Sequence, residues 1–168
     1  MKGSTLKGKA HKFGDNISTD LIAPGRLFHL RNNLPELAKH TLEDADPEFA
    51  KKVKKGDFVV GGRNFGLGSS REHAPVIIKM TGVSAVLAKS FARIFFRNAV
   101  NCGLPVLECN TDNIRAGDEL EVDLSRGAVI NKTRKTKISF HRLPAIMIAI
   151  LDSGGLVEYI KKNKDLKI

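Results

Sequence analysis

Cysteine and aromatic residues are scarce in this chain of 168 residues. It has two cysteines, Cys102 and Cys109, one tyrosine and no tryptophan. The cysteines do not form a Cys-x-x-Cys pair, and no neighbouring histidine or cysteine completes a zinc or iron–sulfur ligand set. We therefore expect two small apolar residues in or near a core, without a disulfide between them.

Long apolar runs are also missing. The longest, from Ala145 to Leu151, has seven residues, far fewer than the roughly 18 that a membrane-spanning helix needs. The first residues, Met1–Thr5, lack the apolar segment of a secretory signal. These absences exclude membrane and secreted classes, so we expect a cytoplasmic protein. The length and the 42% of hydrophobic residues suit one globular domain that spans residues 1–168.

Acidic residues are outnumbered, with 18 Asp and Glu against 28 Lys and Arg, for a formal net charge of +10. A basic balance of this size is compatible with nucleic-acid binding. The positive charges, however, gather in clusters that are typical of a solvated surface. Aromatic residues make up only 6% of the chain, so few side chains could stack on bases. We favour a surface that attracts carboxylate substrates or acidic proteins, and keep an anion-binding or RNA-binding module as the alternative.

The order of predicted elements indicates the fold class. A short strand is expected at residues 9–13, and strand, helix, strand, helix and strand follow one another between residues 58 and 108, which predicts a parallel α/β unit. After Gly117 the alternating pattern predicts antiparallel hairpins, and two helices end the chain. The expected fold class is α/β, with a mostly parallel core sheet and C-terminal β-hairpins.

Capping residues set the expected helix boundaries. Asp46 is expected to cap a short helix that runs to residue 54, with Pro47 as its first residue. Ser90 is expected to cap a second helix, which runs to about Asn101. Gly103, just beyond, is expected to end it. Residues 26–33 are expected to form a loop.

The candidate site lies in the glycine-rich segment Gly61–Pro75, at a strand-to-helix junction where open α/β sheets bind ligands. Its glycine spacing matches neither a P-loop nor a dinucleotide-binding fingerprint. Ser69 and Glu72 have the spacing of a capping box. A helix capped by Ser69 would place Pro75 at its sixth position, at a cost of about 3 kcal/mol, whereas a serine cap contributes only about 1 kcal/mol. The helix is therefore expected to begin at Glu72 or later.

This start leaves Ser69, Ser70 and Arg71 in the loop before the helix. Two hydroxyls, a guanidinium and the unpaired N–H groups of a helix start then gather in a small volume. Such a volume suits carboxylates, because arginine binds them through two parallel hydrogen bonds and the helix N-terminus adds positive potential. The same positive potential favours a negatively charged serine oxygen, so a serine base becomes chemically reasonable.

Three motifs occur in order along the chain: Asp15-Asn-Ile-Ser-Thr-Asp20, Asn64-Phe-Gly-Leu-Gly-Ser-Ser-Arg-Glu-His-Ala-Pro75 and Ala88-Lys-Ser-Phe-Ala-Arg-Ile-Phe-Phe-Arg-Asn98. Through them the chain resembles the swivelling domain of the aconitase superfamily, over nearly its whole length. The overall length and residues 25–47 are most similar to the small subunits of 3-isopropylmalate dehydratase, a form shared with archaeal homoaconitase. The resemblance implies a three-layer swivelling β/β/α domain.

The resemblance also implies an activity, that of a hydro-lyase which moves a hydroxyl between adjacent carbons. Water leaves to give an alkene diacid and adds back with the opposite placement, which interconverts 2-isopropylmalate and 3-isopropylmalate in leucine biosynthesis. Ser69 carries over as the catalytic base, and Ser70 and Arg71 carry over as ligands of a substrate carboxylate. No cofactor is implied in this chain. A 4Fe–4S cluster, held by three cysteines, is expected in a large-subunit partner, with which the chain forms a heterodimer or heterotetramer.

The segment that contains His29, Leu30 and Arg31 occupies the family's substrate-discriminating position, with His29 where the family has tyrosine. Leu30 and Phe28 would suit an isopropyl group, whereas Arg31 would suit an additional carboxylate. Homoaconitate or a citrate-like tricarboxylate therefore stays open as the alternative substrate, and an ordinary surface connection stays open as the alternative role of the segment.

Three further residues have both a functional and a structural interpretation. His73 is either an acid of the site or a residue that packs and orients the loop. Arg93 and Arg97, four apart on one predicted helix, either line the mouth of the site toward the partner or are solvated helix arginines.

Overall fold

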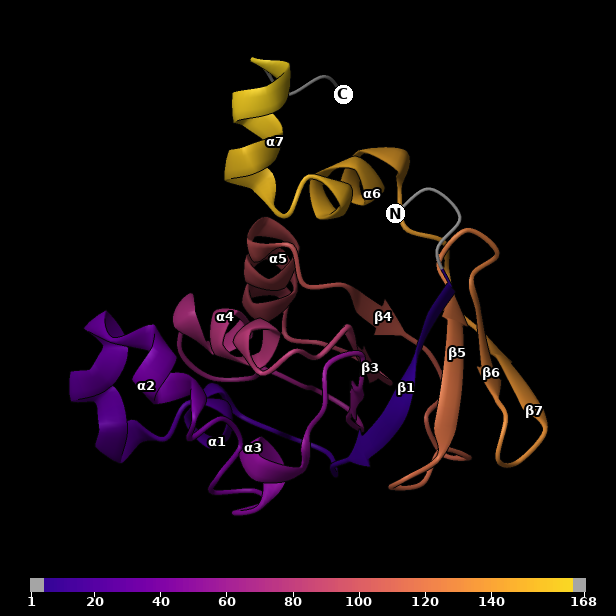
Figure 1. Ribbon diagram of the computed structural model, residues 1–168, viewed down its shortest axis with the longest axis horizontal. Helices are drawn as coiled ribbons and strands as arrows, with labels where there is room; N and C mark the ends of the chain where they lie inside the picture. Colours follow the sequence, from indigo (N-terminus) through magenta and orange to yellow (C-terminus); the bar gives the residue numbers. More distant parts are fainter. Residues whose placement is uncertain (1–4, 165–168) are drawn as a thin grey trace.

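The computed structural model of the chain describes residues 5–164. Its centre is a curled sheet of seven strands in the order β4-β3-β2-β1-β5-β6-β7 (Figure 1). The strands are β1 (Thr5–Lys12), β2 (Phe58–Val60), β3 (Ala85–Ala88), β4 (Val106–Glu108), β5 (Glu119–Asp123), β6 (Ala128–Asn131) and β7 (Thr136–Ser139). β1 to β4 pair in parallel, whereas β1, β5, β6 and β7 pair antiparallel, so β1 joins the two halves.

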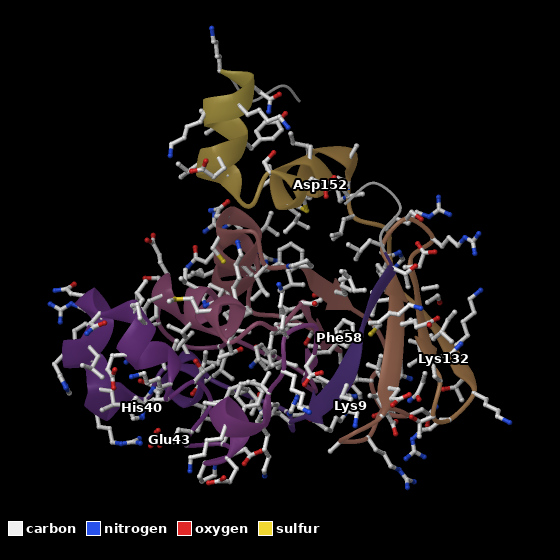
Figure 2. The ribbon with its side chains drawn as sticks, in the orientation of Figure 1. Lys9, His40, Glu43, Phe58, Lys132 and Asp152 are labelled. Atoms are coloured by element: carbon white, nitrogen blue, oxygen red, sulfur yellow. The ribbon has the colours of Figure 1, made fainter. Side chains whose placement is uncertain are left out.

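Side chains of the parallel strands alternate between two cores. Phe58 and Val60 of β2 pack with the antiparallel strands in one core, whereas Val59 packs with the helices in the other. All three side chains are fully buried, which is typical of parallel strands covered on both faces. Phe58 is labelled in Figure 2, beside β1, the strand that joins the two halves of the sheet. The result is three layers, β/β/α, as the resemblance implied.

Helices form the third layer, on the face of the parallel strands that is turned away from the hairpins (Figure 1). They are α1 (Thr19–Ile22), the 3-10 helix η1 (Gly25–Asn32), α2 (Leu34–Ala38), α3 (Phe49–Lys52), α4 (His73–Met80), α5 (Arg93–Cys102), α6 (Ala145–Asp152) and α7 (Leu156–Asn163). Within residues 5–164, no helix combines the length and the apolarity needed to cross a membrane.

Two expected helix starts were wrong. The helix near residue 46 begins only at Phe49, because the Asp46 carboxylate accepts a hydrogen bond from the Glu48 amide at 3.0 Å and closes a turn of its own. α5 begins at Arg93 rather than directly after Ser90. The Ser90 hydroxyl instead accepts a hydrogen bond from the Asn64 amide at 2.8 Å, so this side chain anchors the glycine-rich loop. Residues 26–33 were expected to form a loop, but all of them except Asn33 belong to η1.

Candidate functional site

The glycine-rich loop lies along the N-terminal Asp15–Asp20 motif. The Gly66 amide donates to the Ile17 carbonyl at 2.7 Å, and the Thr19 amide donates to the Leu67 carbonyl at 2.8 Å. The Asp15 carboxylate accepts a hydrogen bond from the Arg63 amide at 2.6 Å. Two of the three sequence motifs therefore form one continuous substructure, although more than 40 residues separate each of these pairs.

Gly66 is required where the loop crosses α5. Its φ is +80°, a left-handed value that favours glycine. A Cβ atom on Gly66 would lie 2.2 Å from Cγ of Phe95. The loop thus packs directly on the aromatic side chain of α5, which sets its position relative to that helix.

Ser69 lies exposed beyond this crossing. Its hydroxyl oxygen is 3.4 Å from the hydroxyl oxygen of Thr19, a side chain that is only 2% exposed. α4 begins at His73, so the helix does start after Glu72 as predicted, and Pro75 is its third residue, where proline is tolerated. Ser69 is therefore left outside the helix, with its oxygen open to solvent on one side and next to Thr19 on the other.

Arg71 is held by the protein. Its guanidinium pairs with the Asp20 carboxylate at 2.5 Å and donates to the Ala23 carbonyl at 2.9 Å. Sequence analysis did not anticipate the pairing with Asp20. The pairing orients the guanidinium and reduces the freedom that Arg71 would lose on binding a ligand.

Arg71 also belongs to a cationic and aromatic cluster with η1. The guanidinium carbons of Arg31 and Arg71 lie 4.4 Å and 5.8 Å from the centre of the Phe28 ring, and the His73 ring is 6.5 Å from it. Burial, together with the positive charges of Arg71 and Arg31, lowers the pKa of His73. The structure thus brings Arg31 to the Arg71 loop.

The other two residues of the expected discriminating segment are placed differently. Leu30 is half-buried and packs against the helix-side core. His29 is exposed on η1 and makes no polar contact with the part of the chain that the structure describes.

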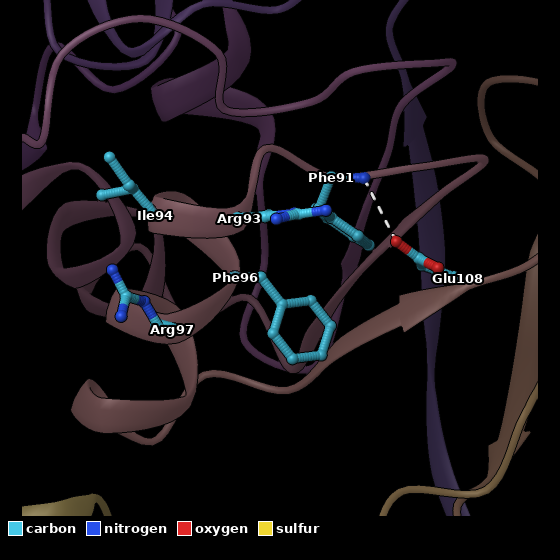
Figure 3. Close-up of a pocket in the computed structure, with 6 residues that line it drawn as sticks. All are labelled: Phe91, Arg93, Ile94, Phe96, Arg97 and Glu108. Carbon is cyan, nitrogen blue, oxygen red and sulfur yellow. Dashed lines mark hydrogen bonds between the residues drawn. The ribbon is translucent and has the colours of Figure 1, made fainter.

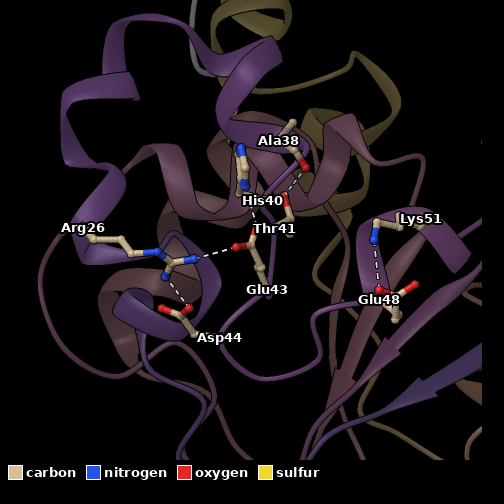
Figure 4. A network of polar contacts seen from close by, with 8 residues as sticks. All are labelled: Arg26, Ala38, His40, Thr41, Glu43, Asp44, Glu48 and Lys51. Atoms are coloured by element: carbon tan, nitrogen blue, oxygen red, sulfur yellow. Dashed lines mark hydrogen bonds and ion pairs between the residues drawn. The ribbon is translucent and has the colours of Figure 1, made fainter.

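η1 is anchored by a network of polar contacts (Figure 4). Arg26 pairs with Glu43 at 2.5 Å and also with Asp44. His40 contacts the Glu43 carboxylate, and its hydrogen bond lowers the pKa of that group. The network ties the start of η1 to the segment after α2, so the Phe28 cluster sits on a supported element.

Comparison with known proteins defines the family. The aconitase C-terminal domain family matches residues 16–112. The chain is 63% identical to "3-isopropylmalate dehydratase small subunit 2" of Archaeoglobus fulgidus, over 97% of this chain and 99% of that protein. It is 60% identical to "3-isopropylmalate dehydratase small subunit 1" of Thermotoga maritima, over 94% and 96% of the two chains. The chain belongs to the family of 3-isopropylmalate dehydratase small subunits.

A solved structure supports the same membership. The crystal structure of 3-isopropylmalate dehydratase (LeuD) from Methanocaldococcus jannaschii superposes with a TM-score of 0.91 at 46% identity, over 96% of each chain. The family and the three-layer α/β fold predicted from the motifs are thereby confirmed, and the family is one of hydro-lyases.

The cysteines of this small subunit are not arranged as ligands of a metal. Both are free, and burial raises the pKa of the Cys109 thiol to about 12. Among residues 5–164, no group of three or more His, Cys, Asp or Glu side chains is placed to hold a metal ion. An iron–sulfur cluster does not fit this part of the chain.

Thr19 is, after Asp20, a second residue of the candidate site to which sequence analysis assigned no role. It lies inside the Asp15–Asp20 motif, which carried the resemblance but no assigned role. The only available signal was that motif, because contact with Ser69 arises from a fold that brings together residues 50 positions apart.

Proposed function

We propose that this chain is the small subunit of a two-chain hydro-lyase that interconverts 2-isopropylmalate and 3-isopropylmalate, in the cytoplasm and as a step of leucine biosynthesis. The names of relatives at 60% and 63% identity over nearly the whole chain support this substrate and a large-subunit partner. Family membership favours this enzymatic role over the RNA-binding alternative.

Within that reaction, we assign Ser69 as the base. The proton moves from a substrate carbon to the Ser69 oxygen, the hydroxyl leaves the neighbouring carbon, and both add back with the opposite placement. A serine oxygen acts in this way only if its anion is stabilised. The contact of 3.4 Å between the exposed Ser69 hydroxyl and the buried Thr19 hydroxyl carries this proposal, because Thr19 can donate a hydrogen bond to that anion.

Ser70 and Arg71 are assigned as ligands of a substrate carboxylate. Ser70 is exposed beside Ser69, and the Arg71 guanidinium is already oriented by Asp20 and by the Ala23 carbonyl. A guanidinium offers five N–H donors, so Arg71 can bind a carboxylate while it keeps these two contacts.

We assign the 4Fe–4S cluster to the large subunit, in a heterodimer or heterotetramer. The family's cluster takes three cysteine ligands, whereas this chain has two cysteines in all. One of them, Cys109, is buried and keeps its proton. The cluster would supply a Lewis acid to the shared site.

One observation favours a second candidate substrate. Arg31 lies over Phe28, the same ring that Arg71 approaches, so two cations flank one exposed aromatic side chain. This pair would suit the additional carboxylate of homoaconitate or of a citrate-like tricarboxylate. Turnover of the reconstituted pair on isopropylmalate, homoaconitate and citrate would decide between the substrates.

Substitution of Ser69 tests the assignment of the base. In a complex with the large subunit, Ser69→Ala is expected to lower kcat by roughly 10²- to 10⁴-fold, the range for loss of general-base catalysis. Complex formation should stay unchanged, because the substitution removes one small hydroxyl from an exposed loop position and adds neither bulk nor charge. Near-normal turnover of Ser69→Ala would show that Ser69 is only structural, and isomerisation by this chain alone would refute the two-chain site.

A further inference from the structure

One face of α5, at its N-terminal end, is both apolar and cationic. Ile94 is 42% exposed and forms part of a contiguous apolar patch, which is more informative than a single exposed apolar residue. Phe91 and Phe96 beside it are half-buried. Together with Arg93, Arg97 and Glu108 these residues line an open pocket of about 560 Å³ (Figure 3). We call Phe91, Arg93, Ile94, Phe96 and Arg97 the α5 face.

The two arginines of the α5 face carry uncompensated charge. Arg93 and Arg97 are exposed and four residues apart, so they lie on one side of the helix. Neither makes an ion pair with a carboxylate among residues 5–164, in contrast to Arg71. Glu108, in the same pocket, instead accepts a hydrogen bond from the Phe91 amide at 3.3 Å, drawn as a dashed line in Figure 3.

The α5 face lies next to the Ser69 loop. The Ala92 amide donates to the Phe65 carbonyl at 2.9 Å, and Gly66 packs on Phe95 of the same helix. Ser69 follows Gly66 by three residues, a span of at most about 11 Å even in a fully extended chain.

This proximity limits where a partner can dock. A protein interface of standard size covers about 800 Å² on each partner, which corresponds to a disc of roughly 16 Å radius. A subunit that closes an active site over Ser69 therefore also reaches the start of α5.

We propose that the α5 face is a docking surface for the large subunit, and that the large subunit presents an acidic surface with an apolar centre to it. The proposal rests on the proposed function, because a two-chain site requires a partner over Ser69. Aromatic and arginine side chains are enriched at the centres of protein interfaces. Unpaired surface arginines favour an acidic partner and speed its association.

Charge reversal on the α5 face tests the proposal. The double variant R93E/R97E should bind the purified large subunit at least about 30-fold more weakly than the unchanged chain, because two attractive contacts become repulsive. The matched control is K135E/K137E, which changes the net charge equally in the exposed β6–β7 hairpin, at the opposite edge of the sheet from β4. Its Kd should stay within about threefold. The measurement is calorimetry or surface plasmon resonance with the full chains, with circular dichroism to verify folding.

A second variant keeps the test decisive if R93E/R97E does not fold. Ile94→Asp leaves both arginines in place, alters an exposed position, and should weaken binding about tenfold or more, because it puts a charge in the apolar centre. Unchanged Kd values for the folded α5 variants would overturn the proposal.

Ser69→Ala separates this proposal from the proposed function. It should bind the large subunit with an unchanged Kd while kcat falls by roughly 10²- to 10⁴-fold. If it keeps its turnover, the assignment of the base fails, whereas the binding results for the α5 face are unaffected.

Discussion

At the scale of single residues, the contact between Thr19 and Ser69 links the fold most directly to the chemistry. The threonine hydroxyl is fixed in a buried position, and the serine hydroxyl is exposed next to it. A fixed donor that is already in place when charge develops stabilises an anion more than solvent does, because it needs no reorganisation. In the proposed reaction Thr19 acts through Ser69, which would make it a positioning residue.

Thr19→Val should separate this role from packing. Valine keeps the shape but removes the donor, so kcat of the reconstituted enzyme should fall by roughly 10²-fold with KM little changed. Loss of a donor to the anion also raises the pKa of the serine hydroxyl, so the pH at which kcat rises should move upward. Thr19→Ser, which restores the hydroxyl, should recover most of the activity. Equal kcat values and pH profiles for Thr19→Val and the unchanged protein would exclude the role.

At the scale of elements, the glycine-rich loop is positioned by close packing as well as by hydrogen bonds. It crosses α5 at Gly66, where no side chain fits. The same crossing brings the loop to the α5 face, so the site and the proposed docking surface share one contact.

Gly66→Ala should therefore destabilise the protein more than positive φ alone would. Gly117→Ala is the matched control, because Gly117 has a φ of +82° and nothing within 4 Å of its would-be Cβ. The control should cost about 1 to 2 kcal/mol of unfolding free energy, the price of left-handed backbone. Gly66→Ala should cost roughly 1 to 3 kcal/mol more, from the overlap with Phe95. Urea denaturation measures both, and equal losses would contradict the close contact.

At the scale of the whole molecule, one buried carboxylate supports each half of the sheet. Burial alone would raise the pKa of Asp57, but its hydrogen bonds with His11 and the Lys9 and Lys54 amides lower the pKa below its usual value. Asp118 has the same place in the antiparallel half. Burial alone would raise its pKa, but hydrogen bonds from the Arg115 amide and from the side chains of Asn131 and Arg134 lower the pKa below its usual value.

These lowered pKa values predict loss of stability in acid. An aspartate in the unfolded chain titrates near pH 3.9, and the native pKa of Asp57 lies lower. The ionised carboxylate thus stabilises the fold above about pH 4, and this contribution is lost as the pH falls through the native pKa. Asp57→Asn should lose about 1 to 3 kcal/mol at neutral pH and show a shallower decline in acid. Urea unfolding over a pH series measures this, and parallel declines would contradict it.

The sequence by itself determined the family, the fold class and the loop that contains Ser69. These depend on local rules: Pro75 forbids a helix that starts at Ser69, glycines and hydrophobic runs mark the parallel unit, and three motifs in order identify the relatives. Helix starts near Asp46 and Ser90 were mispredicted because Asp46 closes a local turn with the Glu48 amide, whereas Ser90 bonds to the distant Asn64 amide.

Only the tertiary structure decided which distant residues meet. It paired Asp20 with Arg71, placed Thr19 at Ser69, and put Arg31 rather than His29 beside the loop. It also extended β1 back to Thr5, because those residues pair with β5. Such contacts join positions tens of residues apart. Local sequence patterns do not encode them, because these distances are set only when the layers pack together.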